Sequence, residues 1–530
     1  MSRDSAHREP LSVRQWDVHD FSFKSNKKHD NEFLVNFKAI VKNPNGALFE
    51  IPGFYDGNAT WKIRISPTIE GVWSIETVCP DDAGLDGHEI EFLCVKNGNS
   101  NIHGRLRIDK KYPRHFVFED GTRYFLMGYE CDWLFAIDMD KKHKENLEKF
   151  VKKIKRFGFN HVLMNVYAYD TPWCSGKTSE YDYGPPLLHP WIGGNDNPDF
   201  TRFDLRFWKH FDKVMQILHE NGVTAHLMIK VYNKMVNWPP KFSDEEYLFF
   251  KWLVARYSAY PNLVWDLTKE GWRDPDIKYK VHWLIFLKEN DPYKHLVTIH
   301  DDDEGYYSGA YDGIVDFHTD QHHEDFHRVA LEQRIRKEWP IVNAEFGYER
   351  GVKGLGDYTD PASLPPEEVA SRALEILMAG CYCVYYYNPT AWDVIRFEDT
   401  PTGYYYFKNI KQIFERIQYW KMEPRDDLID QGYCLANDCE EYLFMIPNPS
   451  WNSLYTIRIN GKGDDVFRMM WLHPLAGEEF QGGFIKAGLH KIKPPLRWMR
   501  YFRAYRQWEG LPVLLHVKRR KDCKLNENSF

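Results

Sequence analysis

The sequence predicts an α/β protein in which a (β/α)8 TIM barrel is flanked by N-terminal and C-terminal β-sandwich domains. A central region alternates between strand-like and helical segments, whereas the regions on either side contain strand-like segments only. The chain has 530 residues, too many for one hydrophobic core, which indicates about two to four domains.

Residues 10–112 are predicted to form an N-terminal β-sandwich of immunoglobulin-like size. Short strand-like runs are separated there by the turn signals NPNG, YDGN and IEG. No helical periodicity persists through this region. Two packed antiparallel sheets account for such a pattern.

Residues 113–420 are predicted to form the barrel. The eight strand-like runs are YFLMGYECDW, FNHVLMNVYAYD, VTAHLMIKVYN, NLVWDLTKE, HLVTIHDDDE, GIVDFHTDQHH, PIVNAEFGYE and CYCVYYYN. A helical segment follows each run except the fifth, after which no clear helix is visible. Gly158, Gly222 and Gly380 stand just before the next strand, where C-terminal helix caps are expected.

Residues 421–530 return to strand-like segments and are predicted to form a second, C-terminal β-sandwich. These segments include GYCLANDCEEYLFMIPN, SLYTIRING and VFRMMWLHPLAGEEF. The last residues, HVKRRKDCKLNENSF, are expected to be a solvated end.

Composition narrows the partners and the compartment. The formal net charge of −8 gives no reason to expect nucleic acid or an anionic membrane surface as a partner. No segment approaches the roughly 20 apolar residues that cross a bilayer, and the start of the chain has no apolar signal-peptide region. With nine cysteines in no metal-ligand spacing, the sequence favours a cytoplasmic protein with reduced thiols. A secreted chain that has lost its signal peptide would look the same, and a homo-oligomer stays open.

Two glutamates are the candidate catalytic residues. In a (β/α)8 barrel the active site lies at the carboxyl ends of the strands. Glu270 ends the fourth predicted strand and Glu345 ends the seventh. Because these strands lie across the barrel from one another, the two carboxylates can face each other over a substrate. Acid/base glycoside hydrolysis needs that arrangement.

Several stretches resemble a known family. WDVHDFSF, GFYDGNATWKIRISPTIEGVWSIET and YFLMGYECDWLF are similar to the apiosidase-like, cellulase-related bacterial barrels with an N-terminal immunoglobulin-like sandwich domain of unknown function. More broadly, the pattern resembles the clan A retaining glycoside hydrolases. The resemblance implies that Glu270 is the acid/base and Glu345 the nucleophile.

Lys269 departs from the clan pattern, which usually has Asn just before the acid/base. A nearby cation would lower the pKa of Glu270, whereas a general acid at neutral pH benefits from a raised pKa. Three alternatives remain open: Lys269 points away, it contacts an anionic or unusually shaped substrate, or the acid role is compromised.

Other residues at or near the ends of predicted strands are candidates for substrate binding. They are Glu130, Asp132, Trp133, Asn165, Tyr167, His226, Tyr232, His318 and Trp392. Aromatic rings stack on the apolar faces of sugars and carboxylates accept from hydroxyls. A core histidine with satisfied ring nitrogens is an equal alternative for His226. The run HDDDEG, from His300, is interpreted as a solvated acidic loop, and Glu349 is the competing candidate nucleophile.

No metal and no cofactor are expected. His318, Asp320, His322 and His323 could together suggest a metal. Metal-dependent hydrolase barrels, however, usually begin with an H-x-H pair on strand one, and LMGYECDW has none.

The predicted function is a retaining glycoside hydrolase that acts on the ends of oligosaccharides or plant glycosides and resembles an apiosidase. The loop 171–198 is expected to wall one side of the pocket. The alternative is a non-catalytic carbohydrate-binding protein on a degenerate barrel.

Overall fold

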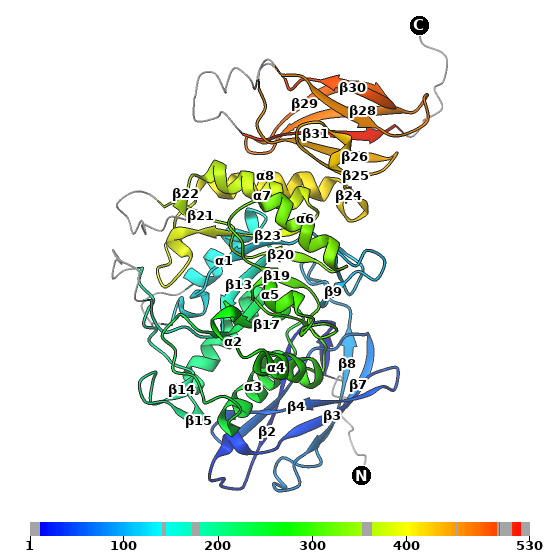
Figure 1. Ribbon diagram of the computed structural model, residues 1–530. Helices are drawn as coiled ribbons and strands as arrows, with labels where there is room; N and C mark the ends of the chain where they lie inside the picture. The colour runs from blue at the N-terminus through cyan, green and yellow to red at the C-terminus, as the bar shows by residue number, and fades with distance from the viewer. Residues whose placement is uncertain are drawn as a thin grey trace.

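The computed structural model describes residues 11–139, 145–171, 181–351, 363–450, 453–495, 498 and 511–520. Sheets from the N-terminal region lie at one end of the molecule and sheets from the C-terminal region at the other (Figure 1). A region of alternating strands and helices lies between them. This arrangement confirms the predicted α/β class.

Eight parallel strands form the path of the central sheet. They are β12 (Met127–Glu130), β13 (His161–Asn165), β16 (Thr224–Val231), β17 (Leu263–Lys269), β18 (Leu296–Thr298), β19 (His318–Asp320), β20 (Ile341–Asn343) and β23 (Tyr382–Tyr387). Their order is β18-β17-β16-β13-β12-β23-β20-β19, which is chain order around a ring that opens between β18 and β19. At that opening His300, which follows β18, forms a parallel bridge with Thr319 of β19.

A helix follows each strand of this path. The helices are α1 (Asn146–Arg156), α2 (Leu205–Glu220), α3 (Asp244–Tyr257), α4 (Ile277–Asn290), α5 (Asp303–Tyr307), α6 (Phe326–Arg336), α7 (Pro366–Met378) and α8 (Thr402–Arg416). The sequence explains where several begin, because the side chains of Asp204, Ser243 and Asp276 cap the first turns of α2, α3 and α4. The fifth helix has only five residues, which is why no helical period is visible there.

The N-terminal region contains two sheets around one core. The strands are β1 (Ser12–Arg14), β2 (His19–Lys24), β3 (Lys38–Lys42), β4 (Leu48–Pro52), β5 (Phe54–Gly57), β6 (Thr60–Ile65), β7 (Gly71–Val78) and β8 (Glu89–Val95). One sheet has the order β1-β8-β7-β3-β4 and the other β2-β6-β5. Trp61 and Ile63 from the second sheet share a buried cluster with Trp73 and Phe92 from the first.

A small antiparallel sheet spans the predicted boundary at residue 112. It consists of β9 (Leu106–Ile108), β10 (Phe116–Phe118) and β11 (Arg123–Tyr124). The Phe116 ring lies 5.3 Å from that of Phe317, just before β19. Residues of this sheet therefore cover the amino ends of the parallel strands and leave the carboxyl ends for chemistry.

The C-terminal region also contains two sheets. Its strands are β24 (Glu423–Pro424), β25 (Tyr433–Asn437), β26 (Glu441–Ile446), β27 (Tyr455–Ile459), β28 (Val466–His473), β29 (Glu478–Lys486), β30 (Gly488–Ile492) and β31 (Val513–Arg519). Six strands have the order β24-β25-β26-β31-β28-β29, and β27 pairs with β30. His327 of α6 stacks on Tyr433 at 3.7 Å, which joins this region to the central helices. Two short pairs complete the fold, β14 (Trp191–Ile192) with β15 (Asp199–Phe203) and β21 (Tyr348–Glu349) with β22 (Ser363–Leu364).

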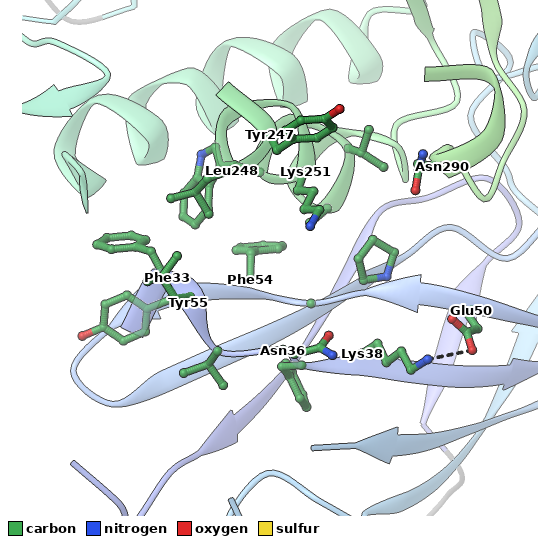
Figure 2. A pocket seen from close by; sticks show the side chains of 18 of the residues that line it. Phe33, Asn36, Lys38, Glu50, Phe54, Tyr55, Tyr247, Leu248, Lys251 and Asn290 are labelled. Atoms are coloured by element: carbon green, nitrogen blue, oxygen red, sulfur yellow. Dashed lines mark hydrogen bonds and ion pairs between the residues drawn. The ribbon is translucent and has the colours of Figure 1, made fainter. Parts of the chain in front are cut away.

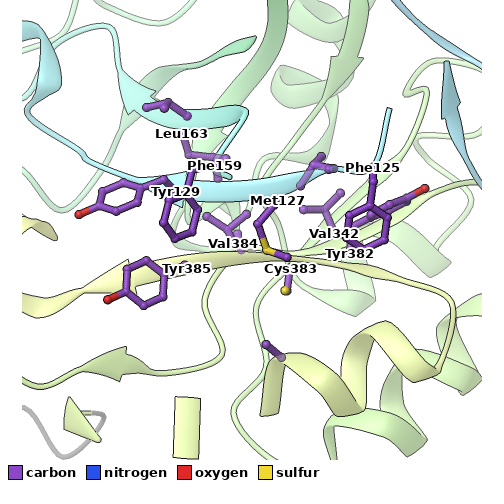
Figure 3. Close-up of a cluster of buried hydrophobic side chains, with 14 of the residues drawn as sticks. Phe125, Met127, Tyr129, Phe159, Leu163, Val342, Tyr382, Cys383, Val384 and Tyr385 are labelled. Carbon is purple, nitrogen blue, oxygen red and sulfur yellow. The ribbon is translucent and has the colours of Figure 1, made fainter. Parts of the chain in front are cut away.

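Close packing joins β12 to β23, the first and the last of these eight parallel strands in chain order. Met127 pairs with Cys383 across the two strands, which run side by side in Figure 3. A Cβ on Gly128 would lie 2.6 Å from Cγ2 of Val384, so only glycine allows this approach. No helix in the described part of the chain is long and apolar enough to cross a bilayer.

Candidate active site

A buried lysine lies among acidic side chains at the carboxyl ends of the parallel strands. The ammonium of Lys269 donates to Glu130, to Asp132 Oδ1 at 3.1 Å and to the Tyr386 hydroxyl at 2.8 Å. It also lies 3.0 Å from Glu345 Oε1. Lys269 is only 1% exposed. We call these five residues the Lys269 cluster.

The orientation of Lys269 resolves part of the question that the sequence left open. The side chain points into the protein, and its ion pairs among the described residues are with Glu130, Asp132 and Glu345. Its charge is therefore directed at the candidate nucleophile. The acid/base candidate does not take part in these ion pairs.

Glu345 is held as an anion. Burial acts to raise its pKa, but the charges of Lys269 and His300 and the hydroxyl of Tyr348 outweigh burial and hold the pKa at about 2. The carboxylate is therefore ionised at neutral pH, as a nucleophile must be.

The two acids after strand β12 share the cation with Glu345. Burial raises the pKa of Glu130 well above its ordinary value, and the neighbouring charges of Glu345 and Asp132 add to this effect against Lys269. Asp132 Oδ2 lies 3.6 Å from a second buried lysine, Lys234.

Glu270 follows β17 in a strained backbone conformation. Its φ is 55°, in the left-handed region that a non-glycine residue seldom adopts. Asn233 donates to Glu270 Oε2 at 2.7 Å, and Arg273 contacts the same oxygen. Such strain is typical of functional sites.

The charges that act on Lys234 include both candidate catalytic carboxylates. Burial lowers its pKa, assisted by the charge of Lys269, while Asp132, Glu270 and Glu345 act to raise it. The Lys234 ammonium is therefore within electrostatic range of both Glu270 and Glu345. The two carboxylates border one region at the carboxyl ends of the strands.

Three of the predicted binding residues lie beside this region. Trp133 is buried, with the Lys234 ammonium 5.8 Å from its ring centroid. Asn165 ends β13 fully buried, and its side-chain amide has no hydrogen bond within the described part of the chain. Trp392 lies 5.5 Å from Tyr348, whose hydroxyl donates to Glu345.

The remaining predicted binding residues have other surroundings. Tyr167 is buried and bonds to His189 at 2.8 Å. His226 bonds to His161 at 2.9 Å and to Asp266 at 2.8 Å, which matches the core-histidine alternative. Tyr232 is half-buried beside Asp274. His318 packs on Tyr306 of α5, with ring centroids 3.7 Å apart.

Glu349, the competing nucleophile, lies outside the Lys269 cluster. It accepts from the Tyr385 hydroxyl and from the backbone N–H of Gly403 at the start of α8. Burial raises its pKa to about 7, against these hydrogen bonds. These contacts indicate a structural role for Glu349.

Glu349→Gln should flatten the pH dependence of stability. The folded pKa of Glu349, about 7, is above the ordinary 4.5, so its stabilising contribution is full below pH 4.5 and is lost as pH rises through 7. This loss amounts to roughly 3 kcal/mol. Urea unfolding at pH 5 and pH 8 should show a smaller difference for Glu349→Gln than for the parent protein. Equal differences would contradict the raised pKa.

Sequence reasoning missed Asn233, Lys234, Arg273 and Tyr386. Asn233 and Lys234 follow β16 directly, so the rule that selected Glu270 would also have found them. The interpretation of HDDDEG as a solvated loop was correct for Asp302 and Glu304, which are exposed, and wrong for the start of the run. His300 and Asp301 are fully buried, because Asp301 pairs with Lys280 of α4 at 2.6 Å.

A large cavity lies away from these charges. It has a volume of about 880 Å³ between the N-terminal strands and helices α3 and α4, with Phe33, Phe54 and Tyr55 facing Tyr247 and Leu248 (Figure 2). No residue of the Lys269 cluster lines it. Cavity size is therefore a poor guide to the chemistry of this protein, and the buried charges are a better one.

The predicted wall 171–198 is described only in part. Residues 172–180, which include Trp173, lie outside the described residues. Thr171 donates from its hydroxyl to Asp393, which follows β23. The role of loop 171–198 as one wall of the pocket stays a prediction.

Two family models match the chain. The model described as "Apiosidase-like, catalytic domain" matches residues 110–430, and a domain of unknown function, DUF5060, matches residues 12–79. No curated protein sequence matches the chain.

Solved structures share the fold. One is from a protein of Bacteroides vulgatus ATCC 8482 assigned to the glycoside hydrolases. It has a TM-score of 0.77 at 19% identity and covers 96% of this chain and 100% of its own. Another, a glycoside hydrolase family 5 protein from the same organism, has a TM-score of 0.59 at 16% identity over 78% of this chain and 94% of its own.

Proposed function

Because the chain belongs to the apiosidase-like family and is therefore a glycoside hydrolase, we propose that it cleaves O-glycosidic bonds by a retaining double displacement. Glu345 attacks the anomeric carbon, and Glu270 protonates the departing oxygen. Water then attacks the glycosyl-enzyme while Glu270 removes its proton. The observation that carries this assignment is the contrast between the two carboxylates, with Glu345 bound to the Lys269 ammonium and Glu270 outside that ion-pair cluster.

The architecture proposed is a (β/α)8 barrel at 113–420 between β-sandwiches at 10–112 and 421–530. The ring order of the eight strands and the bridge between His300 and Thr319 support closure. The shared core of the two N-terminal sheets supports the first sandwich.

The contacts of the Glu270 carboxyl described above are all made by one of its two oxygens. Asn233 and Arg273 both contact Oε2, so Oε1 is the oxygen that carries the proton in the first step. In the second step the same oxygen accepts the proton of the attacking water. Arg273 is half exposed, so solvent screens the attraction between its charge and the Glu270 carboxylate.

The substrates proposed are oligosaccharides or plant glycosides trimmed from one end, with apiose-containing glycosides as the named class. Burial of Glu345, Asn165 and Trp133 supports a closed site that accepts a chain end. A panel of aryl glycosides tests this proposal, including an apioside. Release of sugar from long internal segments alone would contradict exo action.

Glu270→Gln should lower kcat/KM by about 10²- to 10⁴-fold on a glycoside with a poor leaving group, because that oxygen must be protonated as the bond breaks. The loss in the glycosylation step should be smaller for an aryl glycoside with an acidic phenol, which leaves without help. Kinetics on both substrates measure this difference, with Glu349→Gln as the matched control. Equal losses on both substrates would contradict the acid role.

The second candidate function is carbohydrate binding without catalysis. It is favoured by Lys269, which stands where the related clan usually has Asn. Incubation with plant and microbial oligosaccharides separates the two functions. Turnover that disappears in Glu270→Gln and Glu345→Gln excludes the binding protein, whereas binding without turnover favours it.

A further inference from the structure

A second group of titratable side chains, two of them buried, lies outside the Lys269 cluster. It consists of Asp303 at the start of α5 and of His318 and Asp320 on β19. One potential ligand atom from each residue lies within 4.8 Å of the other two. Three ligands bound at about 2.0–2.4 Å from a single ion have such separations.

The group faces the helices. Thr319, between His318 and Asp320, bonds to Thr298 of the neighbouring strand at 2.9 Å. Because side chains alternate along a strand, His318 and Asp320 project to the opposite face. There the ring of His318 contacts Tyr306 and Tyr307 of α5. Glu270 and Glu345 take no part in this group.

His318 has unmet bonding capacity. Its ring is fully buried, and neither ring nitrogen has a hydrogen-bond partner within the described part of the chain. The nearest carboxylate oxygen, Asp303 Oδ1, is 3.7 Å from Nε2. An imidazole buried in this way normally has a partner, since an unpaired polar atom costs about 1–3 kcal/mol.

The two carboxylates are each oriented by a neighbouring side chain. Gln333 donates to Asp303 Oδ1 at 3.0 Å. His322 donates to one oxygen of Asp320 and thereby fixes the orientation of that carboxylate.

We propose that Asp303, His318 and Asp320 bind one divalent transition-metal ion between β19 and helix α5. A neutral imidazole nitrogen with two carboxylate oxygens suits Zn²⁺ or Mn²⁺ better than Mg²⁺, which prefers oxygen ligands alone. Asp303 is 46% exposed, so the ion has access from solvent. The ion would clamp the five-residue helix α5 to the sheet, which is a structural role separate from glycoside hydrolysis.

The test uses the full-length protein after treatment with a chelator and dialysis. Isothermal titration with Zn²⁺ should show one site that Mg²⁺ does not occupy, and thermal unfolding should shift upward with Zn²⁺. Asp303→Asn should weaken binding at this site by at least about tenfold. His318→Phe, which keeps an aromatic ring against Tyr306, should abolish it. His323→Ala, at an exposed neighbouring histidine, should bind as the parent protein does.

Circular dichroism verifies that each variant is folded, and the half-exposed position of Asp303 makes Asp303→Asn the safer of the two. If the parent protein binds no Zn²⁺, or if both ligand variants bind it with unchanged stoichiometry and affinity, the proposal is overturned. Loss of binding in His323→Ala alone would assign the ion to surface histidines and would also overturn it.

Discussion

Glu345→Gln should lower kcat/KM by about 10⁴-fold or more, since removal of a nucleophile from a covalent mechanism costs of this order. The amide keeps the size of the side chain and can still accept from Tyr348. It cannot form the glycosyl-enzyme, because a neutral amide is a poor nucleophile. Steady-state kinetics on an aryl glycoside that the parent protein hydrolyses measure the loss in kcat/KM.

Glu349→Gln is the matched control, four residues later and equally buried. It should retain activity within a few-fold, since Glu349 contacts Tyr385 and Gly403 on the helix side. In Glu345→Ala, azide ion can enter the vacated space and attack the anomeric carbon as Glu270 protonates the leaving oxygen. Activity retained in Glu345→Gln but lost in Glu349→Gln would reverse the assignment.

Lys269→Met should destabilise the protein by about 3–5 kcal/mol at neutral pH, because it leaves buried carboxylates without their cation. Methionine has a similar length, so little packing is lost. The pKa of Glu345 should also rise from about 2, because Lys269 is the main charge that lowers it. The ionisation of Glu345 should then move toward neutral pH in the kcat/KM profile.

The sign of the pH dependence separates this effect from simple loss of packing. In the parent protein the depressed pKa of Glu345 contributes stability above its ordinary 4.5, and that contribution is lost as pH falls toward 2. The difference in the free energy of unfolding between Lys269→Met and the parent protein should therefore become smaller at acid pH. Urea unfolding at pH 7 and pH 3.5 measures this difference. A difference that is the same at both pH values would indicate a simple loss of packing.

A double variant isolates the interaction itself. Lys269→Met combined with Glu345→Gln removes both charges, and it should be less unstable than the sum of the two single variants. Additive effects on the free energy of unfolding would mean that the ion pair between Lys269 and Glu345, at 3.0 Å, contributes no interaction energy.

The sequence located the strands because each is a short apolar run followed by a helical period and a polar strand end. Glu270 and Glu345 were found by the same rule, since carboxyl ends of parallel strands meet at one face. The direction of Lys269 could not be predicted. A residue at a strand end can turn inward or outward, and its contacts come from β12 and β23, which are far away in the chain.

His318 shows that the sequence also could not predict which face of the sheet a side chain occupies. The run DFHTDQHH places a histidine at a strand end, but its face depends on register, and a shift of one residue reverses it. In the structure Thr319 faces the neighbouring strand and His318 faces α5. Burial of His300 and Asp301, at the start of HDDDEG, was equally invisible, because Lys280 and Tyr311, which bond to Asp301, come from other segments.

The anomeric configuration of the first sugar released tests the double displacement most directly. Proton NMR of an early reaction mixture, recorded before mutarotation, resolves the two anomers. The proposed attack by Glu345, followed by attack of water, predicts a product with the same configuration as the substrate. A first product of the opposite configuration would show a single displacement by water and would contradict the assignment of Glu345 as the nucleophile.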